Sequence, residues 1–145
     1  MYQWFRLTLF ITLFSPLISV ADIALVVHID NPLVSLSADE IKGIYKVRRL
    51  RFPDSSPIIL SYQPDTLEIT QQFFQRVLGR PMSQHSRFWA TRVFSGRMLR
   101  PVKLMNDQAV IEWVSKNKGG IGYIDNANLS DAVKKIATIE NASIE

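Results

Sequence analysis

Apolar and polar positions follow one another along this chain in blocks that predict alternating strands and helices. The run from Ile23 to Val27 is continuously apolar and rich in β-branched residues, which is typical of a strand buried on both faces in a parallel sheet. A second run of this kind, from Ile58 to Leu60, follows a segment of basic and turn residues. Between the two runs, Ile41, Ile44 and Tyr45 recur at helical spacing. The pattern therefore begins as strand, helix, strand.

Polar residues at the expected helix starts support this assignment of strands and helices. Ser37 and Glu40 form the capping-box pattern, in which each side chain bonds the other residue's backbone N–H, at the start of the first helix. Asp65 and Glu68 form a similar pattern at the start of a second helix. Gly79 is placed to end that second helix in a left-handed conformation. Each predicted helix thus has a local start signal, and the second also has a stop.

Two more helices are predicted further along the chain. Ser83 is the expected cap of a third helix, which ends at Gly96. A fourth helix begins near Asn106 and carries one apolar stripe. It runs into Gly119 and Gly120, and we expect one of these glycines to adopt the left-handed conformation that ends the helix.

The order of the elements predicts the fold class. A short apolar strand from Ile121 to Ile124 follows the fourth helix, and residues 132–139 form a last strand or a short helix. Strands alternating with helices favour an α/β fold, because parallel strands are joined by crossover helices. We therefore expect a single lobe with a mostly parallel central sheet flanked by helices.

The first residues have the order of a secretory signal. Arg6 precedes a short apolar run, and Ser19-Val20-Ala21 supplies the small residues that a signal peptidase requires. We expect residues 1–21 to be a signal peptide and residues 22–145 to be one periplasmic domain. An uncleaved membrane anchor is the alternative, but Pro16 interrupts a run already short of the roughly 20 apolar residues that span a bilayer.

The composition and the residue spacing argue against several kinds of functional site. The chain has no cysteine, which excludes disulfides, thiolate metal sites and a cysteine nucleophile. Its two histidines, His28 and His85, have no acidic residues at metal-ligand spacing, and no Gly-x-Ser-x-Gly segment indicates a serine hydrolase. We therefore expect no enzyme, no metal and no cofactor. The net charge of +4 suits an anionic ligand without requiring one, and export argues against nucleic acid.

Two groups of basic residues have both a structural and a functional interpretation. The first could bind an anion or anionic lipid, although a solvated loop is the more frequent explanation. It consists of Lys46, Arg48, Arg49 and Arg51. The second flanks the turn at Gly96 and could bring a bidentate donor to phosphate or carboxylate, although such arginines also satisfy helix C-termini. It consists of Arg92, Arg97 and Arg100.

Several of these segments together resemble the phosphate-binding proteins of ABC transporters, which are type II periplasmic solute-binding proteins. The helix that leads into Ile121-Gly122-Tyr123 resembles the late helix-to-strand segment of that family. The strand ending at Asn31-Pro32, the helix from Leu36 to Tyr45 and the loop Phe52-Pro53-Asp54 also resemble family segments. Phe94-Ser95-Gly96 occupies the place of an aromatic-glycine turn.

The resemblance implies an anion site at the start of the second helix. In the family, a Ser-Gly-Thr sequence there holds phosphate with amides and hydroxyls. Here the loop reads Gln63-Pro64-Asp65-Thr66-Leu67-Glu68, so the candidates for a comparable hydroxyl are Thr66 and, one turn later, Thr70. Two carboxylates in this loop oppose an anion. The expected ligand contacts are Asn31, Gln63, Asp65, Thr66, Ser95 and Arg97.

The chain matches only the second of the family's two lobes, and this leaves two functions to consider. The first is a non-catalytic periplasmic protein that binds a small anion such as phosphate, weakly or with a partner. The partner could be a membrane transporter, a receptor sensor domain or a second copy of the chain. The alternative is a protein–protein interaction or sensory accessory module without ligand transport, which an exposed apolar patch would favour.

Overall fold

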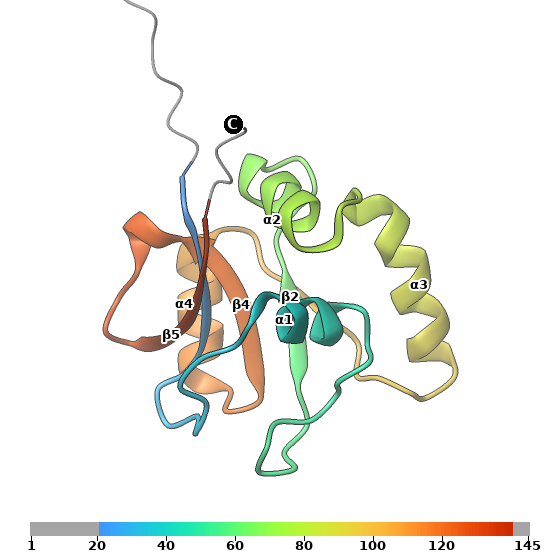
Figure 1. The fold of residues 1–145 in the computed structure, drawn as a ribbon, viewed down its shortest axis with the longest axis horizontal. Helices are drawn as coiled ribbons and strands as arrows, with labels where there is room; N and C mark the ends of the chain where they lie inside the picture. The colour runs from blue at the N-terminus through green and yellow to red at the C-terminus, as the bar shows by residue number, and fades with distance from the viewer. Residues whose placement is uncertain (1–20, 141–145) are drawn as a thin grey trace, which may run out of the picture.

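One mixed sheet of five strands organises residues 21–140, which are the residues that the computed structural model describes (Figure 1). The predicted signal peptide therefore lies outside the described residues, apart from its last position. The strands follow the order β3 (Val102–Lys103), β2 (Ile59–Tyr62), β4 (Gly120–Asp125), β1 (Ile23–His28) and β5 (Val133–Ile139) across the sheet. The first strand of the chain thus lies between the last two.

The prediction of a mostly parallel sheet was wrong in its strand directions. Strand β2 runs parallel to β3 and β4, but β1 runs antiparallel to both of its neighbours, β4 and β5. Every residue of β1 is buried, as predicted. Burial on both faces was taken as a sign of parallel pairing. It arises here because β1 is an inner strand with helices on both sides of the sheet, whichever way its neighbours run.

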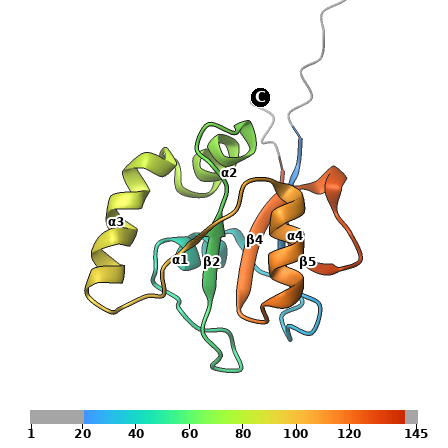
Figure 2. The ribbon, with the colours of Figure 1, turned by 180° about the vertical axis from the view of Figure 1, so that it is seen from behind.

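Alternate residues of β1 belong to two separate apolar cores. Ile23, Leu25 and Val27 pack into the larger core with α1 (Ala38–Tyr45), α2 (Glu68–Leu78) and α3 (Met82–Phe94). The residues between them pack into a smaller core with α4 (Asp107–Lys116), which covers the opposite face (Figure 2). Among residues 21–140, no helix has the length and apolar character needed to cross a membrane.

The local signals for helix starts were correct at Ser37 and Asn106 and wrong in the two other cases. The capping box at Ser37 is present, with both of its hydrogen bonds to and from Glu40. Helix α2 instead begins after Leu67, which makes no side-chain capping bond, so the predicted cap at Asp65 does not form. Helix α3 begins after Pro81 rather than at Ser83, because the fixed φ of proline suits the residue that enters a helix.

Glycines after α4 are required by close packing rather than by a left-handed turn. The helix ends at Asn117, whose φ is −126°, so the expected left-handed glycine stop was wrong. A Cβ atom on Gly120 would lie 2.7 Å from the Trp113 ring, and one on Gly122 would lie 2.6 Å from Val110 Cγ1. Because these glycines have no Cβ atom, α4 can approach β4 closely and pack against it in the smaller core.

We predict that Gly122→Ala destabilises the protein by about 1–3 kcal/mol, because the new methyl group would overlap α4 and force the helix away from the sheet. Gly43→Ala is the matched control. Gly43 lies within α1 with open space around its Cα, so alanine should leave stability unchanged or raise it by up to about 1 kcal/mol. Urea unfolding of both variants measures the difference, and equal midpoints would contradict the packing role of Gly122.

Candidate functional site

The predicted site lies at the carboxyl end of β2, where Gln63 leaves the sheet. This side chain is only 1% exposed. Its backbone N–H donates to Tyr123 Oη at 2.9 Å, and its Nε2 donates to Tyr123 O at 3.0 Å and to Asp107 Oδ1 at 2.7 Å. The side-chain nitrogen is therefore already engaged by the protein. Gln63 thus forms part of the base of this surface.

Asp107, in the first turn of α4, was not among the predicted site residues. Its second carboxylate oxygen accepts from the backbone N–H of Asp125 at 3.0 Å and from Asn128 Nδ2 at 2.8 Å. The carboxylate thus joins the ends of β2 and β4 to the short 3₁₀ helix η1 (Asn126–Asn128). Sequence alone gave no signal for this role, because an acidic residue in a first turn is ordinarily explained by the helix dipole.

Tyr123 occupies the centre of this network. Its Oη lies 2.9 Å from Thr70 Oγ1 in α2, in addition to accepting from Gln63. Its ring stacks on Phe73, with 4.1 Å between the ring centroids. Burial, the largest cause, raises the pKa of Tyr123 to about 12, so the phenol stays neutral near pH 7. The Tyr123 phenol beneath the predicted site is therefore neutral, and it is hydrogen-bonded to Gln63 and Thr70.

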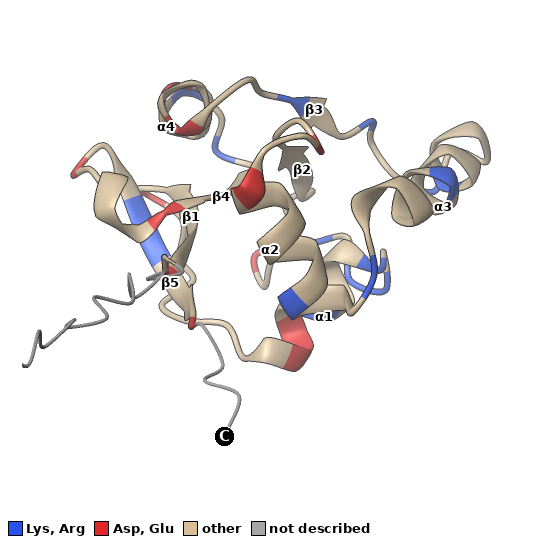
Figure 3. Ribbon diagram, turned by 90° about the horizontal axis from the view of Figure 1, so that it is seen from above, with Lys and Arg blue, Asp and Glu red and all other residues tan. Residues whose placement is uncertain are grey.

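Asp65 and Thr66 lie above this network and are exposed. The Asp65 carbonyl accepts a hydrogen bond from Gln71 Nε2, which ties the loop to the first turns of α2. Because Leu67 provides no side-chain cap, the first amides of α2 have no side-chain acceptor there. Acidic residues cluster at this end of α2, as the red segments in Figure 3 show. An anion here would meet both favourable amides and unfavourable carboxylates.

The other three predicted contacts lie elsewhere in the fold. Asn31 lies at the opposite end of the strands, where it lines a cavity with Pro57 and Gly119, which precede β2 and β4. Its side chain accepts from the Leu33 N–H, which closes a local turn. Ser95 and Arg97 follow the C-terminal end of α3, about 20 Å along that helix from its start near Asp65. The six predicted residues therefore do not form one site.

Comparison with known proteins gives likenesses of fold. No protein-family model matches the chain, and no curated protein sequence matches it. A candidate phosphate ABC transporter substrate-binding protein from Clostridium perfringens, solved with bound phosphate, has a TM-score of 0.61 and 22% identity. The alignment covers 80% of this chain and 45% of that one. An ABC-type phosphate transport receptor from Vibrio cholerae has a TM-score of 0.63 and 16% identity, covering 80% and 46%.

These likenesses confirm the expected fold. A candidate phosphate binding protein from Planctomyces limnophilus is also similar, with a TM-score of 0.59, 15% identity and coverage of 81% and 42%. The chain therefore has the fold of one part of such binding proteins, a mixed α/β sheet flanked by helices. It spans less than half the length of the solved structures that it matches.

We predict opposite effects on stability for two buried tyrosines. Tyr123→Phe removes the acceptor of the buried Gln63 N–H and should destabilise the protein by about 1–3 kcal/mol. Tyr45 is equally buried, but its hydroxyl has no hydrogen-bond partner among the described residues, and burial raises its pKa well above the ordinary value. Tyr45→Phe should therefore leave stability unchanged or raise it by about 1 kcal/mol. Thermal unfolding tests this, and equal losses in both variants would contradict it.

Proposed function

We propose that this chain is a non-catalytic periplasmic binding protein that takes a small anion such as phosphate at the N-terminus of α2. The observation that carries the proposal is the uncapped start of this helix in a fold shared with proteins described as phosphate-binding. Helix N-termini attract anions because their first N–H groups lack partners and the helix dipole is positive there. The exposed Thr66 adds a hydroxyl donor at the same end.

The neighbouring carboxylates set the strength of this binding. Asp65 and Glu68 lie on either side of the helix start and repel an anion by about 1 kcal/mol per close pair in water, and by more where water is excluded. Asp65 can instead accept a hydrogen bond from a phosphate that has kept a proton. We therefore expect weak binding that favours protonated phosphate over sulfate.

A partner that covers the surface would strengthen such a site. The proteins of similar fold are about twice as long as the part of them that this chain matches. Tight binding of small ions requires enclosure from more than one side, because an open surface leaves the ion in contact with water. In this proposal the missing side is supplied by a membrane transporter, by a receptor sensor domain or by a second copy of the chain.

Calorimetric titration of residues 22–145 with phosphate, with sulfate as the comparison anion, tests the proposal. Thr66→Ala should weaken phosphate binding about fivefold, which corresponds to the loss of one hydrogen bond. Asp65→Asn should strengthen sulfate binding by removing a repulsive charge. Ser95→Ala is the control, because it removes the same kind of hydroxyl from the far end of α3. No heat with either anion, or equal losses in Thr66→Ala and Ser95→Ala, would contradict the proposal.

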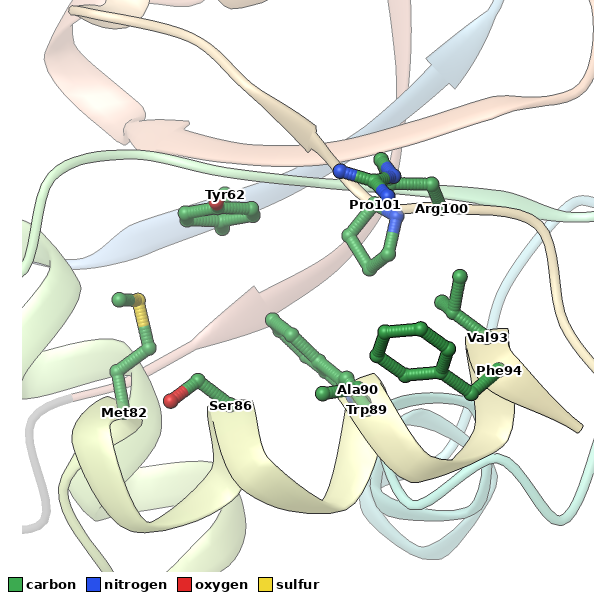
Figure 4. A pocket seen from close by; sticks show the side chains of 9 residues that line it. All are labelled: Tyr62, Met82, Ser86, Trp89, Ala90, Val93, Phe94, Arg100 and Pro101. Carbon is green, nitrogen blue, oxygen red and sulfur yellow. The ribbon is translucent and has the colours of Figure 1, made fainter.

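The alternative function, an interaction module, is favoured by a separate observation. Phe94 is 91% exposed, and it borders an apolar groove of about 390 Å³. Trp89 and Phe94 on α3 face Tyr62 and Arg100 across this groove (Figure 4). Exposed apolar surface that is contiguous, as in this groove, is typical of interaction sites. The stretch from residue 69 to residue 106 contains no acidic residue, so the fitting partner is a peptide segment with apolar and acidic side chains.

We predict that this groove binds a twelve-residue peptide in which leucine and aspartate alternate, and that it does not bind the peptide with lysine in place of aspartate. Phe94→Ser should weaken binding at least tenfold, because exposed aromatic anchors dominate such contacts. Val34→Ser removes an equally exposed apolar side chain outside the groove and should have no effect. Fluorescence anisotropy measures both, and binding of the lysine peptide with equal affinity would contradict the assignment.

A further inference from the structure

A cavity of about 330 Å³ between the C-terminal end of α1 and the middle of α3 collects cations from three parts of the chain. We call it the basic pocket, and its charged and aromatic lining consists of Lys46, Arg48, Arg80, His85, Phe88 and Arg92. Figure 3 shows the blue segments gathered beside α1 and along α3. The residues come from the end of α1, from the loop before α3 and from α3 itself. No local sequence motif places them together.

The fold divides the basic residues that follow α1 into two sets. Arg49 forms an ion pair with Glu40 at 3.1 Å, and Arg51 donates to the Ser55 carbonyl at 2.7 Å. Lys46 and Arg48 instead line the basic pocket. Within residues 21–140, none of the four pocket cations forms an ion pair with a carboxylate. The pocket is thus a concentration of positive charge that no ion pair among residues 21–140 neutralises.

Several contacts hold the basic pocket in shape. The Arg92 guanidinium lies over the Phe88 ring, 4.4 Å from its centroid. His85 is buried and its Nε2 is bonded to the Tyr45 carbonyl. Val47, between the two α1-side cations, has a φ of 60°, a left-handed conformation that β-branched residues rarely adopt. A preformed arrangement of this kind reduces the ordering cost of binding, and backbone strain of this kind concentrates at binding sites.

The pocket groups also act on one another. The pKa of His85 is lowered, mainly by burial and further by the charges of Arg80 and Lys46. The pKa of Lys46 is lowered by partial burial and then by neighbouring cations, Arg48 and Arg80 among them. Like charges that repel in the free protein would be stabilised by an anion between them. No carboxylate lines the pocket.

We propose that the basic pocket binds a multiply charged, phosphate-bearing anion of the diphosphate type. Four cations exceed the charge of a single small anion, and guanidinium groups match phosphate oxygens with paired hydrogen bonds. The cavity volume falls within the range of small-molecule sites. This site is separate from the one proposed at the start of α2, because the basic pocket shares no lining residue with the cavity beside Asp65.

Pyrophosphate titration of residues 22–145, followed by calorimetry and by NMR of His85, tests this site. Arg48→Gln and Arg80→Gln should each weaken pyrophosphate binding about five- to tenfold. Arg87→Gln is the matched control, because Arg87 is an exposed cation of α3 that does not line the pocket. Thr66→Ala should leave pyrophosphate binding at the pocket unchanged, which separates this site from the α2 site. Bound pyrophosphate should raise the pKa of His85, because nearby negative charge favours the imidazolium form.

A second arm distinguishes a soluble ligand from a lipid headgroup. Vesicles of phosphatidylcholine with and without phosphatidylglycerol are sedimented with the protein and with the Arg80→Gln variant. Sedimentation that requires phosphatidylglycerol and Arg80, without pyrophosphate binding, would overturn the assignment to a diphosphate and indicate a lipid phosphate instead. Absence of binding in both arms would overturn the proposal. Equal weakening by Arg87→Gln and Arg80→Gln would also overturn it, because it would show general surface charge and no defined pocket.

Discussion

The hydrogen bonds of Tyr123 fix the geometry on which the proposed α2 site depends. Its ring stacks on Phe73 of α2, and its hydroxyl accepts the N–H of Gln63 at the end of β2. These contacts tie the sheet to the helix at one point, so the start of α2 is presented in a fixed position. Because the contacts are buried, they are protected from competition with water. The loop of Asp65 and Thr66 is the part of this end that remains exposed.

Sequence predicted some of the features that local interactions decide, although the predicted caps at Asp65 and Ser83 do not form. The capping box of Ser37 needs only residues within one turn, and the buried run of β1 needs only a sheet with covered faces. Strand direction was not predictable, because it depends on how distant strands meet. The exposure of Phe94 was not predictable either, because helical spacing shows which residues share a face but not whether a second element covers that face.

The candidate sites also depend on contacts between distant parts of the sequence. Gln63 and Asp107 are far apart in the sequence, and their contact makes Gln63 a structural residue. The basic residues after α1 cannot be told apart by sequence. In the structure, Arg49 forms an ion pair with Glu40, whereas Lys46 lines the basic pocket together with Arg80. A charge cluster becomes a site only when tertiary structure decides which of its members keep their charge available. Which charged side chains remain unpaired is therefore decided by contacts between helices, strands and loops.

The position of β1 has a consequence for the order in which the protein assembles. The strand is made first, but its two partners, β4 and β5, are the last strands of the described chain. During synthesis, the apolar segment from Ile23 to His28 is therefore made before most of the described residues, its two partner strands included. Contacts between segments so distant in the sequence slow folding, and they leave apolar segments exposed until the partner strands pair with them. Strand β1 therefore lacks the neighbours that bury it in the folded sheet until β4 and β5 have been made.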